Sequence, residues 1–278
     1  MPNKDPGFAP AKINLALHVT GQRPDGLHLL DSLVVFAGVG DRLRYAPGGT
    51  LTLEVKGPFG PDLDGEADNL ILRAARLCGA GGTFLLEKNL PVASGIGGGS
   101  ADAAATLRLL AEAGFALPHE EEILALGADV PVCLRGENCM MRGIGEEIDP
   151  VDLPALQLVL VNPGVSVSTS AVFKALEAKD NPEMTPLADP FADWLRAQRN
   201  DLEAPAKQTA PEIATVLNVL EDSGAWLARM SGSGATCFGL FESADAAKNA
   251  AAEISNINPE WWVRAAQTTR ETTKSGNS

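Results

Sequence analysis

The first strong signal in the chain is an alternation of apolar and polar residues between positions 9 and 20. One side is formed by Ile13, Leu15, Leu17 and Val19, and the other by Lys12, Asn14, Ala16 and His18. A period of two residues is typical of a β-strand, here a strand with one apolar face. The pair Asp25-Gly26 is a turn signal, and a second apolar run follows it over residues 29–39.

Further periodic segments in the first half predict both strands and a helix. Residues 51–57 alternate and 83–88 form a short apolar run, which predicts two more strands. Between them, residues 68–82 have the pattern of a helix that begins near Asp68 or Asn69 and ends at glycines. Another helix is expected from Ser100, with its apolar face formed by Ala103, Leu107 and Leu110.

The second half repeats this mixed pattern. It predicts strands at 156–161 and 236–242 and helices around 170–178, 187–202, 211–222 and 243–254. The whole pattern favours an α+β fold. A proline-punctuated connection near residue 150 predicts a boundary between an N-terminal domain, 1–153, and a C-terminal domain, 154–278. We expect the polar tail from about residue 268 to be disordered.

The segment LPVASGIGGGSADAAATLRLL (90–110) places four glycines within five positions, directly between a predicted strand and a predicted helix. Glycines expose backbone N–H groups, and a helix N-terminus adds partial positive charge, so the arrangement suits an anion such as phosphate. Two known phosphate-binding motifs do not match this segment. The dinucleotide fingerprint requires a glycine at the position of Ser100, and the P-loop requires a lysine after its last glycine. The alternative is a glycine-rich turn that binds no ligand.

Two side chains next to these glycines bear on the nature of the anion. Asp102 either complements the dipole of the helix or lies beside a phosphate, in which case a divalent cation would have to offset the repulsion. The Ser100 hydroxyl is of the kind that contacts Mg²⁺ or phosphate. The sequence therefore allows a phosphate and metal site around Ser100, without fixing the metal ligands.

Composition narrows the class of partner. The chain has 278 residues, of which 45% are hydrophobic, and a formal net charge of −14. This charge argues against nucleic acid or an anionic membrane as the main partner. No apolar run approaches a membrane span or a secretory signal. The scattered Cys78, Cys133, Cys139 and Cys237 indicate reduced thiols and a cytoplasmic location.

Six motifs stand in the order found in GHMP kinases, the family named for galactokinase, homoserine kinase, mevalonate kinase and phosphomevalonate kinase. They are PAKINLALHVTGQRPDGLH (10–28), DNLILRAARL (68–77), LPVASGIGGGS (90–100), GADVPVCLRG (127–136), NPGVSVST (162–169) and SGSGATCFG (231–239). The chain resembles this family from about residue 9 to 241. The resemblance implies a domain similar to domain 2 of ribosomal protein S5, a ferredoxin-like C-terminal domain and an active site between them.

The resemblance also implies roles for residues in transfer of a phosphoryl group from ATP, with Mg²⁺, to an alcohol. Asp129 would be the base, and Lys12 would orient it and lower the pKa of the attacking hydroxyl. As isolated residues, Asp129 could instead cap a turn and Lys12 could be a surface lysine. The ATP-binding residues implied by the family are Pro91, Val92, Ala93, Ser94, Gly95, Ile96, Gly97, Gly98, Gly99, Ser100, Ala101, Asn69, Lys88, Ser231, Gly232, Ser233 and Gly234. For Asn69 a helix cap, and for Lys88 an exposed lysine, are the alternatives.

The resemblance also implies an alcohol that carries a cytidine diphosphate group, because similar kinases have D-G-Y-H, with a tyrosine that stacks on cytosine, where this chain has DGLH. Here Leu27 replaces that tyrosine, so we expect His28 to bond the base and the stacking either to weaken or to depend more on Phe173. Asn14 shares the strand face of Lys12 and would contact the same small-molecule substrate. The alternatives are another GHMP kinase, acting on homoserine or mevalonate, and an inactive nucleotide-binding regulator. The sequence is compatible with a monomer or a homodimer.

Overall fold

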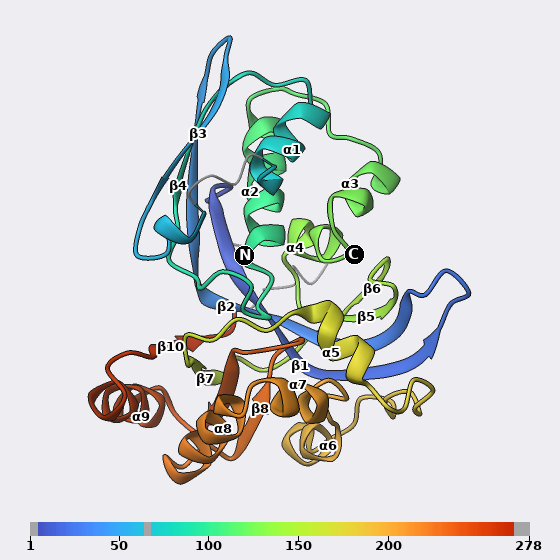
Figure 1. Cartoon of the computed structure of the whole chain (residues 1–278), viewed down its shortest axis with the longest axis vertical. Helices are drawn as coiled ribbons and strands as arrows, with labels where there is room; N and C mark the ends of the chain where they lie inside the picture. Colours follow the sequence, from blue (N-terminus) through green and yellow to red (C-terminus); the bar gives the residue numbers. More distant parts are fainter. Residues whose placement is uncertain (1–4, 64–67, 270–278) are drawn as a thin grey trace, which may run out of the picture.

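The computed structural model describes residues 5–63 and 68–269, and two β-sheets dominate it (Figure 1). The first sheet is built on a long antiparallel pair, β1 (Phe8–Gln22) and β2 (His28–Pro47). Strand β2 also pairs with β4 (Gly82–Glu87) and β5 (Cys139–Gly143). The edges are β3 (Leu51–Lys56), parallel to β4, and β6 (Glu147–Pro150), antiparallel to β5.

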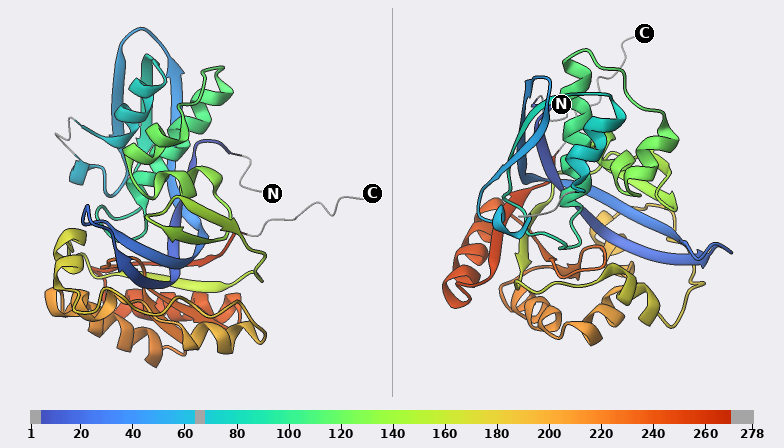
Figure 2. Two further views of the ribbon diagram at one scale, coloured as in Figure 1. Left: turned by 90° about the vertical axis from the view of Figure 1, so that its right-hand side faces the viewer. Right: turned by 45° about the horizontal axis from the view of Figure 1, so that its top comes forward.

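Four α-helices gather on one side of this sheet (Figures 1 and 2). They are α1 (Leu70–Leu77), α2 (Gly98–Glu112), α3 (Glu120–Leu126) and α4 (Val130–Arg135), and a short 3₁₀ helix, η1 (Pro61–Leu63), precedes them. Helix α2 is buried on two sides: Leu110 packs on the sheet together with Ala101, Ala104 and Ala105, whereas Ala103 and Leu107 pack against α1, α3 and α4. This packing fixes the N-terminus of α2, where the glycine-rich loop ends.

The second sheet is antiparallel, with strand order β10-β7-β9-β8. Its strands are β7 (Gln157–Asn162), β8 (Leu227–Met230), β9 (Cys237–Phe241) and β10 (Trp262–Gln267), and its helices are α5 (Thr169–Ala175), α6 (Phe191–Ala197), α7 (Glu203–Thr209), α8 (Glu212–Asp222) and α9 (Ala244–Ile257). Apolar side chains of both sheets pack together, for example Ile13 and Leu15 with Leu158 and Phe238. The domain boundary near residue 153 stays a prediction.

The α+β expectation is confirmed, and most predicted elements are present with shifted ends. Strand β1 departs most clearly from its prediction, because both of its faces are buried rather than one. Register shifts between Pro10 and Lys12, Asn14 and Ala16, and Val19 and Gly21 interrupt its alternation. The predicted one-sided strand is therefore wrong, because the polar side chains are buried as well: Lys12 against Asp129, Asn14 against Ser32, and His18 against Pro182 and Arg199.

Other differences concern helices and the tail. The helix predicted over 187–202 is confined to 191–197, and the helix predicted from Ser100 begins at Gly98. Helices α3, α4 and α7 had no separate prediction. The disorder expected from residue 268 is wrong for its first two positions, because Thr268 N donates to Leu156 O and Thr269 N donates to Phe36 O. The rest of the predicted tail lies outside the described residues.

Candidate active site

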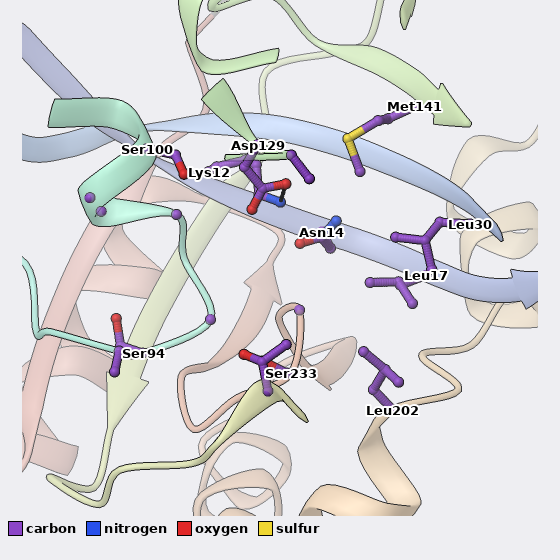
Figure 3. Close-up of a pocket in the computed structure, with 18 of the residues that line it drawn as sticks. Lys12, Asn14, Leu17, Leu30, Ser94, Ser100, Asp129, Met141, Leu202 and Ser233 are labelled. Atoms are coloured by element: carbon purple, nitrogen blue, oxygen red, sulfur yellow. Dashed lines mark hydrogen bonds and ion pairs between the residues drawn. The ribbon is translucent and has the colours of Figure 1, made fainter. Parts of the chain in front are cut away.

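A cleft of about 400 Å³ lies where the glycine-rich loop, strand β1 and the 231–234 loop meet (Figure 3). Many of the predicted site residues line it, namely Lys12, Asn14, Ala93, Ser94, Gly95, Gly97, Gly98, Gly99, Ser100, Asp129, Phe173, Gly232 and Ser233. They come from distant parts of the sequence. The fold thus brings most of the predicted catalytic, ATP-binding and substrate-binding residues to one place.

The glycine-rich loop has a backbone that only glycine adopts readily. Gly95 and Gly97 have φ angles of 76° and 65°, in the left-handed region. Gly97 is the N-cap of α2 and has no side chain to cap the helix. The first backbone N–H groups of α2 therefore have no partner within the helix, and the residues that carry them line the cleft.

The 231–234 loop supports the glycine-rich loop through direct contacts. Ser231 Oγ accepts a hydrogen bond from Asn14 N and donates one to Gly95 O, both at 3.1 Å. A Cβ atom on Gly95 would lie 2.5 Å from Ser231 O, so the two loops approach more closely than a side chain would permit. These contacts give the cleft a fixed floor made of two glycine-containing loops.

Lys12 and Asp129 form an ion pair inside the cleft, with Nζ 2.7 Å from Oδ1 (Figure 3). The Lys12 side chain is 4% exposed, which excludes the surface lysine considered above, whereas the Asp129 side chain is 33% exposed toward the cleft. Asp129 lies at the start of α4 but makes no capping hydrogen bond with its side chain. A buried ammonium thus holds a carboxylate that is still open to a bound molecule.

Asn14 lies beside this ion pair on β1 (Figure 3). Its Nδ2 donates to Ser32 Oγ at 2.7 Å, and Ser32 Oγ donates to Ala16 O. Among the described residues, Asn14 Oδ1 has no hydrogen-bond partner. The side chain is therefore held in one orientation, and its unused acceptor within the described part of the chain is itself buried.

A smaller cavity of about 150 Å³ adjoins the loop and is lined by four more of the predicted ATP contacts, whereas Ile96, Ala101, Ser231 and Gly234 line neither space. Its lining includes Asn69, Lys88, Pro91, Val92 and Asp102. Asn69 Oδ1 accepts a hydrogen bond from Ile71 N, so it caps α1 as well as lining the cavity.

Lys88 is 2% exposed, so the alternative of an exposed lysine is wrong. Asp102 lies beyond the first turn of α2, and its carboxylate pairs with Lys88 rather than complementing the helix N-terminus.

A third cavity continues from the cleft toward the DGLH segment, since Leu30, Ala128 and Phe173 line both spaces. There the rings of His28 and Phe173 stack with centroids 4.5 Å apart. Burial, and then the charge of Lys179, lower the pKa of His28, so its ring is neutral near pH 7. Leu27, 48% exposed, lies at the edge of this space.

Several lining residues had no sequence signal of their own. Met141 and Leu202 line the main cleft as single residues of ordinary elements, and Thr169, which ends the motif at 162–169, had no predicted role. Asp41 was also missed, although it is a fully buried carboxylate within the apolar strand β2 and pairs with Lys88. It follows the apolar run at 29–39 and stands beside Arg42, so the sequence gives no signal of its burial.

The described residues contain no group of three or more His, Cys, Asp or Glu side chains arranged to hold a metal ion. Within the same residues, every helix is too short or too polar to cross a membrane.

Comparisons with known proteins agree on one family. Residues 69–144 match the GHMP kinases N terminal domain, and residues 173–260 match the GHMP kinases C terminal domain. The chain is 58% identical to the 4-diphosphocytidyl-2-C-methyl-D-erythritol kinase of Paracoccus denitrificans, over 92% of this chain and 94% of that one. It is 56% identical to the kinase of the same name from Cereibacter sphaeroides, over 94% and 98% of the two chains.

Solved structures show the same relationship. A crystal structure of 4-(cytidine 5'-diphospho)-2C-methyl-D-erythritol kinase superposes with a TM-score of 0.78 at 33% identity, covering 95% of this chain and 99% of the other. The L. major mevalonate kinase in complex with R-mevalonate gives a TM-score of 0.66 at 15% identity, over 96% of both chains. The second similarity is one of fold alone.

Proposed function

The chain belongs to the GHMP kinase family, and we propose that it transfers the γ-phosphoryl group of ATP to the 2-hydroxyl of 4-(cytidine 5'-diphospho)-2-C-methyl-D-erythritol. This reaction belongs to the non-mevalonate, methylerythritol phosphate route to isoprenoid precursors. The observation that carries the proposal is the Lys12–Asp129 ion pair, which lies between a glycine-rich anion site and the His28–Phe173 cavity. A phosphoryl donor and a cytidine-bearing alcohol can meet at that pair.

The phosphates of ATP would bind to the backbone of the glycine-rich loop. The free N–H groups at the start of α2 donate to phosphate oxygens, and the helix dipole favours their negative charge. The 231–234 loop supports this backbone from below. Phosphoryl transfer depends mainly on positioning and on charge neutralisation, and a rigid backbone cradle supplies both.

Asp129 would act as the base in the transfer step. Its carboxylate accepts the proton of the attacking 2-hydroxyl while the hydroxyl oxygen bonds to the γ-phosphorus and the bond from that phosphorus to the β–γ bridging oxygen breaks, which releases ADP. Lys12 holds Asp129 at 2.7 Å and places a positive charge beside the developing alkoxide. Asn14, which lines the cleft beside this pair, would contact the alcohol.

We propose that Mg²⁺ binds together with ATP, since the described residues offer no dedicated cluster of metal ligands. Mg²⁺ in kinases commonly takes one or two protein ligands and several phosphate oxygens. The Ser100 hydroxyl lines the cleft at the start of α2 and fits such a ligand. When bound, Mg²⁺ would neutralise part of the phosphate charge. A cytoplasmic location and a monomeric or homodimeric state remain predictions.

The alternative substrates are homoserine and mevalonate. The similarity to mevalonate kinase structures concerns the fold, whereas the cavity at His28 and Phe173 would have no function with those small acids. An inactive regulator is disfavoured because Lys12 and Asp129 are both present and paired.

An ATP-consumption assay on the purified protein tests the proposal. We expect turnover with the cytidine diphosphate methylerythritol substrate and none above background with homoserine or mevalonate. The variant Asp129→Asn should retain the fold and lose about 10²–10⁴-fold in kcat, the range for removal of a general base. Turnover on homoserine alone would overturn the substrate assignment, and an undiminished Asp129→Asn variant would overturn the assignment of the base.

A further inference from the structure

Behind the glycine-rich loop lies a buried charge cluster that the reaction scheme above does not use. It consists of Lys88, Asp41 and Asp102, whose exposed fractions are 2%, 0% and 3%. Lys88 Nζ donates to Asp41 Oδ2 and, at 2.7 Å, to Asp102 Oδ2. A buried ammonium with two buried carboxylates is an expensive arrangement, because each charge needs its partners at close range.

Two members of this cluster flank the glycine-rich loop, and the third belongs to the sheet. Lys88 precedes the loop, Asp102 lies in α2 after it, and Asp41 belongs to strand β2. Asp41 Oδ1 also accepts hydrogen bonds from the backbone N–H groups of Asn89 and Leu90, the latter at 2.8 Å. The carboxylate of Asp41 therefore holds the start of the glycine-rich loop directly. It holds the end of the loop indirectly, because Lys88 links it to Asp102.

The same geometry explains the glycine at the helix start. A Cβ atom on Gly98 would lie 3.1 Å from Lys88 Nζ, so the ammonium lies directly beneath the first turn of α2. Two of its three N–H donors are already used by carboxylates. The Lys88 ammonium is thus held by partners within the protein, although Lys88 lines the small cavity beside the loop.

We propose that the Lys88–Asp41–Asp102 cluster is a positioning element that fixes both ends of the glycine-rich loop in its ATP-binding form. Lys88 then affects ATP through the position of the loop and not through a contact with the nucleotide. The proposal rests on the ATP-binding part of the proposed function and is independent of which alcohol is phosphorylated.

The informative variant is Asp41→Asn, because Asp41 lines neither of the two cavities beside the loop. Its amide keeps the shape of the carboxylate but turns an N–H group or a weaker acceptor toward Lys88. We expect the KM for ATP to rise about tenfold, with kcat and the KM for the alcohol changed less than about threefold. The matched control is Glu87→Gln, which removes the charge of an exposed carboxylate next to Lys88 and should change none of these constants.

Hydrogen exchange without ATP gives a second readout that contact with the nucleotide would not change. Lys12 N donates to Ile96 O and Thr236 N donates to Ser94 O, so these two amides report the position of the loop from outside the cluster. In Asp41→Asn they should exchange at least about tenfold faster, whereas amides of β7 should keep their rates. If Asp41→Asn does not fold, Asp102→Asn is measured in the same way, with the same expectation for the two amides.

A double-mutant cycle separates positioning from contact. If Lys88 acts through the cluster, Lys88→Met should raise the KM for ATP less in the Asp41→Asn background than in the parent protein. Additive effects on KM, or unchanged exchange of the Lys12 and Thr236 amides in a folded Asp41→Asn or Asp102→Asn variant, would overturn the proposal. Failure of turnover with the cytidine-bearing alcohol would instead affect the substrate assignment and leave these readouts intact.

Discussion

The pair of residues on which the chemistry depends, Lys12 and Asp129, is separated by 117 positions in the sequence. Nothing in the spacing of the chain predicts their contact, and only the motifs shared with GHMP kinases linked them. The structure adds what those motifs do not contain, namely the burial of Lys12, the partial exposure of Asp129 and the 2.7 Å between them. The role of a residue can therefore be assigned from the sequence, whereas its burial and its distance from other residues require the structure.

Leu27 is the site residue that departs from the family pattern, and its position permits a direct test. It lies 48% exposed at the edge of the cavity that holds His28 and Phe173. An aromatic ring there would stack on the cytosine, and a base–aromatic stack contributes about 1–3 kcal/mol. We expect Leu27→Tyr to lower the KM for the cytidine-bearing substrate about fivefold, measured by steady-state kinetics, and to leave the KM for ATP unchanged.

The control for this prediction is Leu27→Ala, which removes the side chain without adding a ring. It should leave the KM for the alcohol within about threefold of the parent value, because Leu27 provides no π face to lose. An unchanged KM in Leu27→Tyr would mean that the base does not reach this edge of the cavity.

At the scale of elements, the sequence predicted the segments whose apolar residues repeat regularly. Helix α2 and strands β3, β4, β7 and β9 lie close to their predicted positions. Helices α3 and α4 were missed because each is no longer than two turns and shows too few repeats for a period to be recognised. The helix predicted over 187–202 was too long, because the helix begins after its N-cap residue Pro190 and the backbone is extended at its C-cap residue Gln198.

The contact between the two glycine-containing loops could not be read from the sequence, yet it makes a sharp prediction. A Cβ atom on Gly95 would lie 2.5 Å from Ser231 O and 2.7 Å from Gly234 N, and its φ of 76° disfavours any other residue. We expect Gly95→Ala to lower the free energy of unfolding by about 2–4 kcal/mol. Urea denaturation measures this change, and the KM for ATP should rise in the same variant.

Gly99→Ala is the matched control for this substitution. The nearest atom to a Cβ at Gly99 is Leu70 Cδ1 at 3.5 Å, which is ordinary contact. Its free energy of unfolding should stay within about 1 kcal/mol of the parent value, since alanine is accepted within a helix. Equal losses in the two variants would contradict a specific role for the contact between the loops.

At the scale of the molecule, the two halves of the chain are joined along strand β1. Leu17 N donates to Arg199 O, Asp201 N donates to Leu17 O, and Val19 N donates to the side chain of Asp201. These contacts join residues about 180 positions apart in the sequence. They give β1 a short parallel bridge between Leu17 and Asn200, and a partner so distant in the sequence cannot be detected from local periodicity.

His18 lies within this junction, and its burial makes the junction sensitive to pH. Its Nδ1 lies 3.1 Å from Pro182 O, and its Nε2 accepts from Arg199 N at 3.4 Å, so the neutral ring suits both partners.

Burial and the charge of Arg199 lower the pKa of His18, while Asp201 and Asp31 oppose them less strongly. Below about pH 6.5 the unfolded chain therefore takes up a proton that the folded chain resists. Stability due to His18 is fully present above that pH and is lost as the pH falls toward the lower pKa of the folded state. We expect the free energy of unfolding, measured in urea between pH 7.5 and 5, to fall less steeply in His18→Gln than in the parent protein. Identical slopes for His18→Gln and the parent would show that the junction does not depend on a neutral His18.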